Sequence, residues 1–418
     1  MKEISPISKI DAKVCIPGSK SLTHRAFIVA ALANGKSHLE NILCAEDTML
    51  TASALNQMGV NIKIDGKTAT VIGRAGKIFA PKKEIYLGNS GTSMRLLTAI
   101  SALGDGRFIL TGDSRMKQRP IADLLDALNL LGVSAYSIDK SGCPPVEIEA
   151  KGITGGRTGI KTNISSQFLS GLLLAVPYAK NDVIIEVIGN LPSKPYIDLT
   201  LKVMEDFGVR VDYEDYKHFF IPSRQVYKAR DYTIEGDLSS ASYFFAAAAI
   251  LKGKVTVFPI DIDSKQPDIG FLGILEEMGC KAVAKQREVT VIGDDLKGIS
   301  VDMNAMPDLV PTLAVVASFA KGDTIIKNVA HLRAKECDRL SAIATELMNM
   351  GVKVEEKEDG LIIKGGGLEG AIIETYNDHR IAMSFAIAGL KVPGIKIINP
   401  ACVNKSFPEF WDILESLK

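Results

Sequence analysis

The 418-residue chain is long enough for two or three domains and a large buried core. Its 49 Lys and Arg balance 49 Asp and Glu, so no surplus positive charge exists to bind nucleic acid or an anionic membrane non-specifically. With 46% hydrophobic and 23% charged residues, the composition is that of an ordered globular protein. Any site for an anion must therefore be built by gathering cations locally.

The six cysteines are scattered, with no Cys-x-x-Cys pair and no histidine spacing typical of zinc. They predict free or buried thiols rather than a disulfide framework or a metal site. The N-terminal segment lacks the apolar stretch of a signal peptide, and the apolar runs are broken before about 18 positions accumulate. We expect a cytoplasmic protein.

In chain order, the first recurring feature is a helix that ends in glycine and is followed by a β-hairpin. These helix ends recur about every 70 residues, and the following glycines suit a left-handed terminal position: Gly59, Gly132, Gly208, Gly279 and Gly351. Two Asp-Gly pairs, at 65–66 and 359–360, lie between alternating strands and predict hairpin turns.

A second pattern keeps the same period: a helix of small apolar residues, a polar or glycine break, and a short strand. It occurs at residues 26–42, 96–112, 168–189, 243–260, 312–329 and 381–400. Small side chains permit close packing on all sides, so we expect the first helix of each unit to be buried. The two patterns predict six strand, helix, strand, helix and hairpin units, three in each of two lobes. An open solenoid is the alternative, but long units favour closed lobes.

The starts of the small-residue helices are polar, and several carry a cation where the helix dipole disfavours one. Serine, threonine, aspartate and asparagine at these positions can simply cap the helix. Capping does not require the cations, which are Lys20, Arg25, Arg95, His379 and Arg380. This conflict predicts a bound anion at two clusters of three helix N-termini, opposed across a hinge.

The second helices also begin with basic residues, several beside a proline that suits the first helical turn. Their leading segments are 115–120, 193–196, 333–339 and 404–408. For residues 333–339 a solvated charged face is the alternative reading. Lys335 and Arg339, four residues apart, would however repel each other unless an anion lay between them.

Nine segments from Pro17 to Pro408 resemble the enolpyruvyl transferases, in order and at family-like spacing. They are PGSKSLTHRA, LGNSGTSMR, RMKQRPI, SSQFLSGLLL, SKPYIDLTL, EGDLSSASYF, RAKECDRL, YNDHRIAM and NKSFPEF. The fold class that this resemblance implies is α/β, a two-lobed inside-out α/β barrel built from six βαβαββ repeats, three per lobe. It also implies a discontinuous lobe of residues 1–17 plus 236–418, an inserted lobe of residues 18–235, and an active site in the cleft between them.

Within this family, the chain resembles the branch that acts on shikimate 3-phosphate. The implied reaction transfers the enolpyruvyl group of phosphoenolpyruvate to the 5-hydroxyl of shikimate 3-phosphate, releasing phosphate through a tetrahedral ketal, in the shikimate pathway to aromatic amino acids. The alternative is the branch that acts on UDP-N-acetylglucosamine, many members of which carry a loop cysteine that residues 111–120 lack. A scaffold without activity would be expected to have lost Asp308 or Glu336, and both are present.

The resemblance implies no cofactor and no metal, because cationic side chains can stabilise the developing charge. It implies a monomer without nucleic-acid or membrane partners. Phosphoenolpyruvate would be bound by Lys20, Gly91, Arg119, Gln167, Arg339, Arg380 and Lys405. Shikimate 3-phosphate would be bound by Ser21, Arg25, Ser165, Ser166, Gln167, Ser193, Asp308 and Lys335.

The implied reaction needs a proton on the methylene carbon of phosphoenolpyruvate while the 5-hydroxyl loses its proton. The resemblance gives Asp308 and Glu336 as acid/base groups and Lys20 as a third group that shares the transfers; their order stays open. A helix cap is the alternative role for Asp308, and a surface ion pair for Glu336. His331 stands where some family members have Asn, which leaves its substrate contact open.

Overall fold

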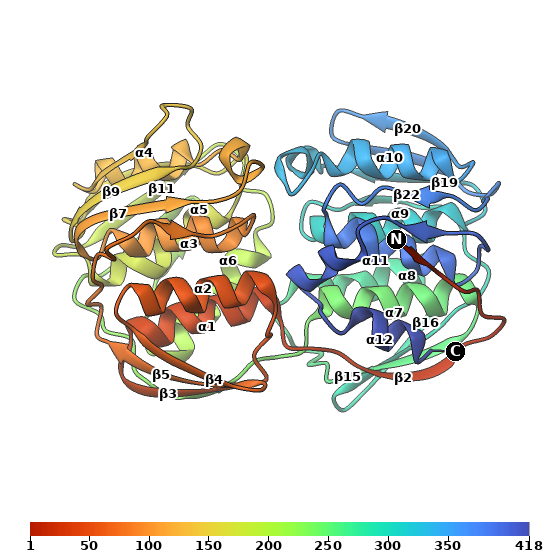
Figure 1. Ribbon diagram of the computed structural model, residues 1–418, viewed down its shortest axis with the longest axis horizontal. Helices are drawn as coiled ribbons and strands as arrows, with labels where there is room; N and C mark the ends of the chain where they lie inside the picture. Colours follow the sequence, from red (N-terminus) through yellow and green to blue (C-terminus); the bar gives the residue numbers. More distant parts are fainter. Residues whose placement is uncertain (418) are drawn as a thin grey trace. The chain divides into compact units, whose positions relative to one another are not determined.

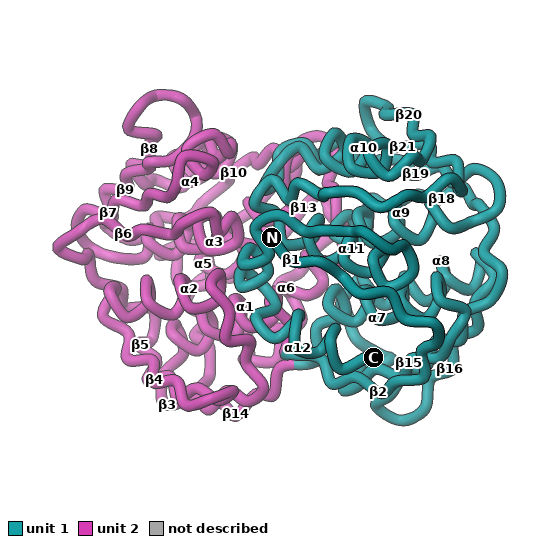
Figure 2. Tube along the Cα trace, turned by 45° about the vertical axis from the view of Figure 1, so that its right-hand side comes forward, with its two compact units in different colours: residues 1–17, 235–418 teal, residues 18–234 magenta. Residues whose placement is uncertain are grey.

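The structure is a computed structural model in which residues 1–417 are described. The chain forms two compact units (Figure 2): a terminal unit, residues 1–17 together with the chain from Glu235 onward, and an inserted unit, Gly18–Ile234. Glu235 lies in the terminal unit because its carboxylate accepts hydrogen bonds from Ser264 and Gln266 of that unit. The sequence predicted that this segment of the terminal unit begins at residue 236, one residue later than in the structure.

The inserted unit contains three repeats, each with two helices and one four-stranded sheet. Its helices are α1 (Lys20–Leu32), α2 (Glu46–Gln57), α3 (Gly91–Ser101), α4 (Ala122–Leu130), α5 (Gln167–Ala175) and α6 (Pro195–Asp206). Its strands are β3 (Asn34–Glu40), β4 (Asn61–Asp65), β5 (Thr68–Arg74), β6 (Ile85–Tyr86), β7 (Asp105–Thr111), β8 (Ser134–Ser137), β9 (Val146–Lys151), β10 (Gly156–Lys161), β11 (Val183–Ile188), β12 (Asp212–Glu214), β13 (His218–Ile221) and β14 (Asp231–Thr233). The sheet orders are β14-β3-β5-β4, β6-β7-β9-β8 and β10-β11-β13-β12.

The terminal unit repeats the same plan. Its helices are α7 (Leu238–Leu251), α8 (Phe271–Glu277), α9 (Val310–Ser318), α10 (Arg339–Asn349), α11 (His379–Gly389) and α12 (Phe410–Glu415). Its strands are β1 (Lys2–Glu3), β2 (Asp11–Cys15), β15 (Lys254–Phe258), β16 (Lys281–Lys285), β17 (Glu288–Ile292), β18 (Ser300–Asp302), β19 (Asp323–Lys327), β20 (Lys353–Lys357), β21 (Gly360–Lys364), β22 (Ile372–Ile373) and β23 (Lys396–Ile397). The sheet orders are β16-β17-β15-β2, β18-β19-β21-β20 and β1-β23-β22.

Every four-stranded sheet consists of one parallel pair followed by an antiparallel hairpin, which is the predicted unit. In the first repeat of each unit, the parallel partner comes from a distant part of the chain. Strand β14 pairs with β3, and β2 pairs with β15. In the sixth repeat, β1 from the N-terminus takes the place of the hairpin, pairing antiparallel with β23.

The first helix of each repeat is buried, as predicted from its small residues. All residues of α1 from Leu22 to Leu32 are buried, as are those of α7 from Leu238 to Ile250. Figure 1 shows these helices inside the sheets of their own units. Each unit has its own hydrophobic core. Among residues 1–417, no helix is both long and apolar enough to cross a lipid bilayer.

The predicted glycine helix ends are confirmed, and both predicted hairpins form, with each turn one residue away from the predicted Asp-Gly pair. All five of these glycines have a positive φ, between 81° at Gly132 and 119° at Gly279. The hairpin β4 to β5 turns at Gly66-Lys67, because Asp65 pairs with Thr68. The hairpin β20 to β21 turns at Glu358-Asp359, because Lys357 pairs with Gly360. Local turn chemistry therefore fixes where each repeat changes from helix to hairpin.

A second recurring glycine lies near the end of the hairpin's last strand, at Gly73, Gly293 and Gly365. Each approaches a backbone carbonyl at the end of the first helix of its repeat. A Cβ atom built on Gly293 would lie only 2.1 Å from the carbonyl oxygen of Ala248. Because backbone cannot move aside as a flexible side chain can, glycine is required for this close approach between sheet and helix.

We therefore expect Gly293→Ala to lower the free energy of unfolding by about 1–3 kcal/mol, the usual cost of overpacking. Gly273→Ala in α8 is the matched control, since its added Cβ has no heavy atom within 4 Å. The control should raise the free energy of unfolding by up to about 1 kcal/mol by restricting the unfolded chain. Urea unfolding of both variants measures the difference, and equal effects would contradict this account.

Candidate active site

At the start of α1, the predicted anion-binding lysine has a carboxylate of the protein beside it. Ser19 caps the helix by accepting a hydrogen bond from the backbone amide of Leu22. The Nζ atom of Lys20 lies 3.5 Å from Oδ2 of Asp47, with 12% and 3% of the two side chains exposed. The sequence predicted an anion beside this cation. The carboxylate of Asp47 therefore supplies part of that negative charge.

The guanidinium of Arg119 lies directly over the first residue of α3. A Cβ atom built on Gly91 would be 2.4 Å from Nη2 of Arg119. The guanidinium is also held by Asn89, because Nη1 donates to its backbone oxygen at 3.1 Å and to its side-chain oxygen at 3.0 Å. Gly91 thus provides the space in which Arg119 rests at the helix start.

The start of α5 is joined to α3 through Arg95, which is only 3% exposed. Its Nη1 donates to Oγ of Ser165 at 3.2 Å and to Oε1 of Gln167 at 2.8 Å. Nε2 of Gln167 then donates to Oγ1 of Thr92 at 3.0 Å. Ser166, also buried, is the residue before the helix. The sequence marked Arg95 as a cation at a helix start but gave it no role, and the structure makes it the organiser of these predicted ligands.

Arg25 connects the starts of α1 and α6. It is 2% exposed, and it donates from Nε to Oγ1 of Thr200 at 2.8 Å and from Nη2 to the backbone oxygen of Tyr196 at 3.3 Å. Its Nη1 donates to the backbone oxygen of Ser21 at 3.0 Å. Burial lowers the pKa of Arg25 to about 10, so it remains a cation at neutral pH. Ser193, just before α6, is buried with a φ of 57°.

In the terminal unit, the first residue of α10 is a buried cation enclosed by three carboxylates. Arg339 is 1% exposed and donates to Asp378 at 2.7 Å, to Asp308 at 3.0 Å and to Glu336 at 2.8 Å. Burial alone would lower the pKa of Arg339, but these three negative charges keep it well above its usual value. From the sequence, Asp378, in the segment YNDHRIAM, is expected only as a polar residue at a helix start.

Asp308 bridges three cations from three elements. It lies in the 3-10 helix η4 (Pro307–Leu309). Its Oδ2 accepts from Nη2 of Arg380 at 2.8 Å, and its Oδ1 faces Arg339 and, at 3.8 Å, Nζ of Lys335. The anion expected between Lys335 and Arg339 is therefore a carboxylate of the protein. About a fifth of the Asp308 side chain, 21%, remains exposed.

The segment 333–339 is divided between two environments. Arg333 pairs with Asp338 at 2.9 Å and with Glu356 of β20 at 2.6 Å, so this cation fastens the hairpin. The solvated charged face that the sequence left as an alternative describes Arg333 in part, because it remains 31% exposed. It does not describe Arg339.

Several predicted site residues contact one another within their own unit. Lys405 is 7% exposed at the end of the 3-10 helix η6 (Pro400–Lys405). Contacts link Asp308, Lys335, Glu336, Arg339 and Arg380 within the terminal unit, which we call the acidic-basic cluster. In the inserted unit, contacts link Gly91 with Arg119, and Ser165 with Gln167.

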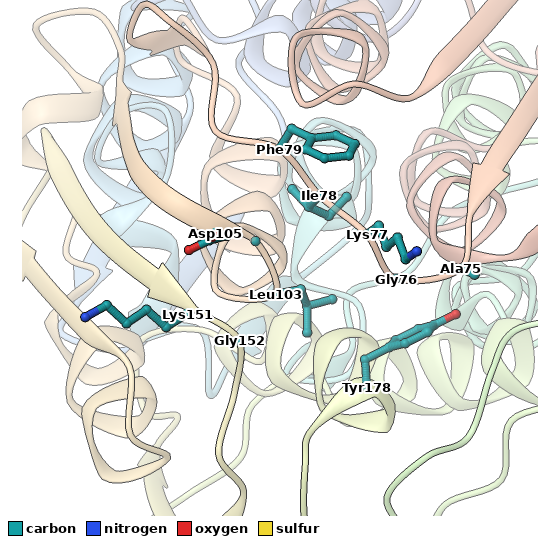
Figure 3. A pocket seen from close by; sticks show the side chains of 11 residues that line it. Ala75, Gly76, Lys77, Ile78, Phe79, Leu103, Asp105, Lys151, Gly152 and Tyr178 are labelled. Carbon is teal, nitrogen blue, oxygen red and sulfur yellow. The ribbon is translucent and has the colours of Figure 1, made fainter.

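A separate pocket lies at the opposite end of α1. Figure 3 shows Gly76, Phe79 and Tyr178 among the residues that line it. The amide of Gly76 donates to the backbone oxygen of Leu32, the last residue of α1. Helix geometry puts this end about 18 Å from Lys20. The pocket thus includes none of the predicted substrate residues, and it lies apart from the helix starts that carry them.

His331 lies in the 3-10 helix η5 (Ala330–Ala334), close to the acidic-basic cluster. Burial, together with the nearby positive charge of Lys335, lowers its pKa to about 4, although Asp308 opposes the shift. His331 is therefore a neutral imidazole at pH 7. It can donate or accept a hydrogen bond there without adding to the positive charge of the cluster.

We expect the imidazole of His331 to titrate near pH 4 by NMR, with the resonance assigned by its loss in His331→Gln. Because its folded pKa lies below the unfolded value of about 6.5, the neutral imidazole stabilises the fold above pH 6.5, and this contribution is lost as the pH falls toward 4. Lys335→Met should raise this pKa but leave it below 6.5, since burial is the larger cause. A midpoint near 6.5 in the wild type would refute the assignment.

The chain matches one family along nearly its whole length. A family model described as EPSP synthase (3-phosphoshikimate 1-carboxyvinyltransferase) matches residues 4–414. A 3-phosphoshikimate 1-carboxyvinyltransferase of Sulfurovum sp. (strain NBC37-1) is 44% identical, over 99% of this chain and 98% of the relative. One of Trichormus variabilis (strain ATCC 29413 / PCC 7937) is 46% identical, over 96% of this chain and 95% of the relative.

Solved structures agree with the sequence comparison. An EPSP synthase from Acinetobacter baumannii has a TM-score of 0.81 and 30% identity, covering 99% of this chain and 97% of its own. The enolpyruvyl transferase NikO from Streptomyces tendae, with a TM-score of 0.78 and 19% identity over 99% of this chain and 96% of its own, supports the fold alone. The predicted fold class, a two-lobed inside-out α/β barrel of six repeats, is confirmed. The chain belongs to the EPSP synthase (3-phosphoshikimate 1-carboxyvinyltransferase) family.

Proposed function

We propose that the predicted residues of both units bind the two substrates of the family's reaction. That reaction, which membership of the family assigns to this enzyme, moves the enolpyruvyl group of phosphoenolpyruvate to the 5-hydroxyl of shikimate 3-phosphate and releases phosphate. Transfer to UDP-N-acetylglucosamine is not favoured by these relatives. Because the two sets of residues lie on different units, the proposal requires both units to engage the same pair of substrates, which is the cleft site expected from the sequence.

Phosphoenolpyruvate, with a carboxylate and a phosphate, is assigned to the cations at the helix starts. Arg119 above Gly91, with Lys20 and Gln167, forms the part in the inserted unit. Arg339, Arg380 and Lys405 form the part in the terminal unit. An arginine fork matches a carboxylate in two hydrogen bonds, whereas a lysine acts as a compact charge. Near-complete burial strengthens each of these interactions with an anion relative to the same pair in water.

Shikimate 3-phosphate is assigned to hydroxyl groups and to Arg25. The proposed ligands in the inserted unit are Ser21, Arg25, Ser165, Ser166, Gln167 and Ser193. Asp308 and Lys335 are proposed to meet its ring hydroxyls from the terminal unit. Since all proposed ligands belong to one chain, we further propose that the enzyme acts as a monomer, in the cytoplasm.

The proposed chemistry is acid/base catalysis by Asp308, Glu336 and Lys20. The 5-hydroxyl gives its proton to a base as its oxygen bonds to C2 of phosphoenolpyruvate, while an acid places a proton on C3, forming the ketal. The methyl group then returns a proton, the double bond re-forms, and phosphate leaves. Asp308, whose charge three cations offset, suits a group that stays close to the 5-hydroxyl, and Glu336 pairs with Arg339 at 2.8 Å.

The observation that carries this proposal is the gathering of five predicted residues into the acidic-basic cluster, on a chain whose relatives share one activity. The experiment is phosphate release from phosphoenolpyruvate. Release should require shikimate 3-phosphate and should not occur when UDP-N-acetylglucosamine replaces it. Release with neither acceptor, or only with the sugar nucleotide, would reject the proposal.

Glu336→Gln should lower kcat at least about 100-fold and change KM only modestly, because it removes a proton-transfer group while keeping the shape and an acceptor for Arg339. The matched control is Glu346→Gln, a buried carboxylate on α10 that accepts from Tyr376 at 2.8 Å. The control should keep its kcat. Steady-state kinetics decide, and an unchanged kcat in Glu336→Gln would remove this residue from the proposed chemistry.

Gly91→Ala should raise KM for phosphoenolpyruvate about 10-fold, a loss of about 1.4 kcal/mol, because the new methyl group would displace the Arg119 guanidinium. KM for shikimate 3-phosphate should change little. Gly273→Ala, whose Cβ has no neighbour within 4 Å, is again the control. If both substrates lost affinity equally in Gly91→Ala, Arg119 would not be specific to phosphoenolpyruvate.

A further inference from the structure

We propose that Thr200 is a positioning residue for Arg25, an inference that rests on the proposed binding of shikimate 3-phosphate by that arginine. Thr200 lies on α6 and is fully buried. Its Oγ1 atom accepts a hydrogen bond from Nε of Arg25, on α1, at 2.8 Å. The Nε–H group is the guanidinium donor nearest the aliphatic stem, so this contact fixes the direction in which the planar fork leaves the stem.

The hydroxyl of Thr200 is itself held in one direction. Oγ1 donates to the backbone oxygen of Tyr196, one helical turn earlier, at 2.8 Å, and it lies 3.0 Å from Oγ of Ser170 on α5. Threonine has few side-chain rotamers in a helix, and one of them allows this bond to the preceding turn. Because a hydroxyl can both donate and accept, Thr200 can contact Tyr196 and Arg25 at the same time. The helices α5 and α6 therefore determine where the acceptor for Nε lies.

The same small network holds the outer end of the guanidinium. Nη2 of Arg25 donates to the backbone oxygen of Tyr196 at 3.3 Å and to Oγ of Ser170 at 3.5 Å. Thr200 contacts all three of these residues, and all of them belong to the inserted unit. Removing the Thr200 hydroxyl would therefore loosen the network at its centre, at the point where α1, α5 and α6 meet.

A hydroxyl suits this place because it orients Arg25 without offsetting its charge. The oxygens that Thr200, Ser170 and Tyr196 present to the guanidinium are neutral. Burial lowers the pKa of Arg25 to about 10, whereas a carboxylate beside it would raise this pKa. Arg25 still remains a cation at neutral pH. A carboxylate in place of Thr200 would also hold the guanidinium, but it would repel the phosphate group of the substrate.

The test is Thr200→Val, which removes the hydroxyl and keeps the branched shape. It should raise KM for shikimate 3-phosphate about 3- to 10-fold, as expected for the loss of one hydrogen bond. KM for phosphoenolpyruvate and kcat should stay within about 2-fold of the wild type. Thr200→Ser, which keeps the hydroxyl, should hold all three values within about 2-fold.

The matched control is Thr98→Val. Thr98 lies on α3, is as deeply buried as Thr200, and donates to the backbone oxygen of Met94, also four residues earlier, at 2.7 Å. Both valine variants lose a buried hydroxyl that bonds to the preceding helical turn, so they should lower Tm by comparable amounts. Only Thr200→Val should change KM for shikimate 3-phosphate. An equal rise of this KM in both variants, or of both KM values in Thr200→Val, would overturn the proposal.

A second comparison tests whether Thr200 acts through Arg25. In an Arg25→Lys background, Thr200→Val should add little, because lysine lacks the Nε–H donor that the hydroxyl accepts. A full additional effect there would reject the positioning role, as would an unchanged KM for shikimate 3-phosphate in Thr200→Val when Arg25→Lys raises it.

Ser170→Ala gives an independent readout if Thr200→Val does not fold. It removes a contact of both Thr200 and Arg25, so it should raise KM for shikimate 3-phosphate about 2- to 5-fold without changing KM for phosphoenolpyruvate. No change in either value would count against the network. If the wild-type enzyme released no phosphate with both substrates, the proposed function would fail instead, so the two failures are distinguishable.

Discussion

The structure depends on keeping buried cations charged at the positive ends of helices. Lys20, Arg339 and Arg380 lie where both desolvation and the helix dipole disfavour them. The protein offsets this cost with its own carboxylates, Asp47 and Asp308 among them. Removing one partner of such a buried pair leaves an uncompensated charge and costs about 3–5 kcal/mol. The cations are therefore held in place by the protein's own carboxylates.

Repetition explains how one chain assembles this arrangement. Each repeat supplies one buried helix, and the three helix starts of a unit come together through contacts between these helices. Ser242, Thr312 and Ser384 join the three inner helices of the terminal unit through hydroxyl contacts of 3.4 and 3.2 Å. The inserted unit instead joins its inner helices near Arg25 and Arg95. The same scaffold thus carries neutral contacts in one unit and cationic contacts in the other.

The repeats, the glycine helix ends and the hairpins were predictable because they are local patterns with a fixed period. The contacts of Arg339 with Glu336, and of Gly91 with Arg119, were not predicted as pairs. The sequence placed these residues near helix starts, and the repeat predicted that such starts converge. Sequence reasoning missed Asp47 and Asp378 as partners. Each is an ordinary residue for its helix, and only the approach of a distant cation gives it a second role.

Arg339 and Arg380 show why the position of a cation alone does not reveal its task. Both lie at helix starts and share Asp308. Arg339 also contacts Glu336 and Asp378, so its hydrogen bonds are directed to the protein and it mainly organises the carboxylates. Arg380 contributes one ion pair of known geometry, with Asp308 at 2.8 Å. Arg339 therefore fixes the positions of Glu336 and Asp308, the two carboxylates that we propose for acid/base chemistry.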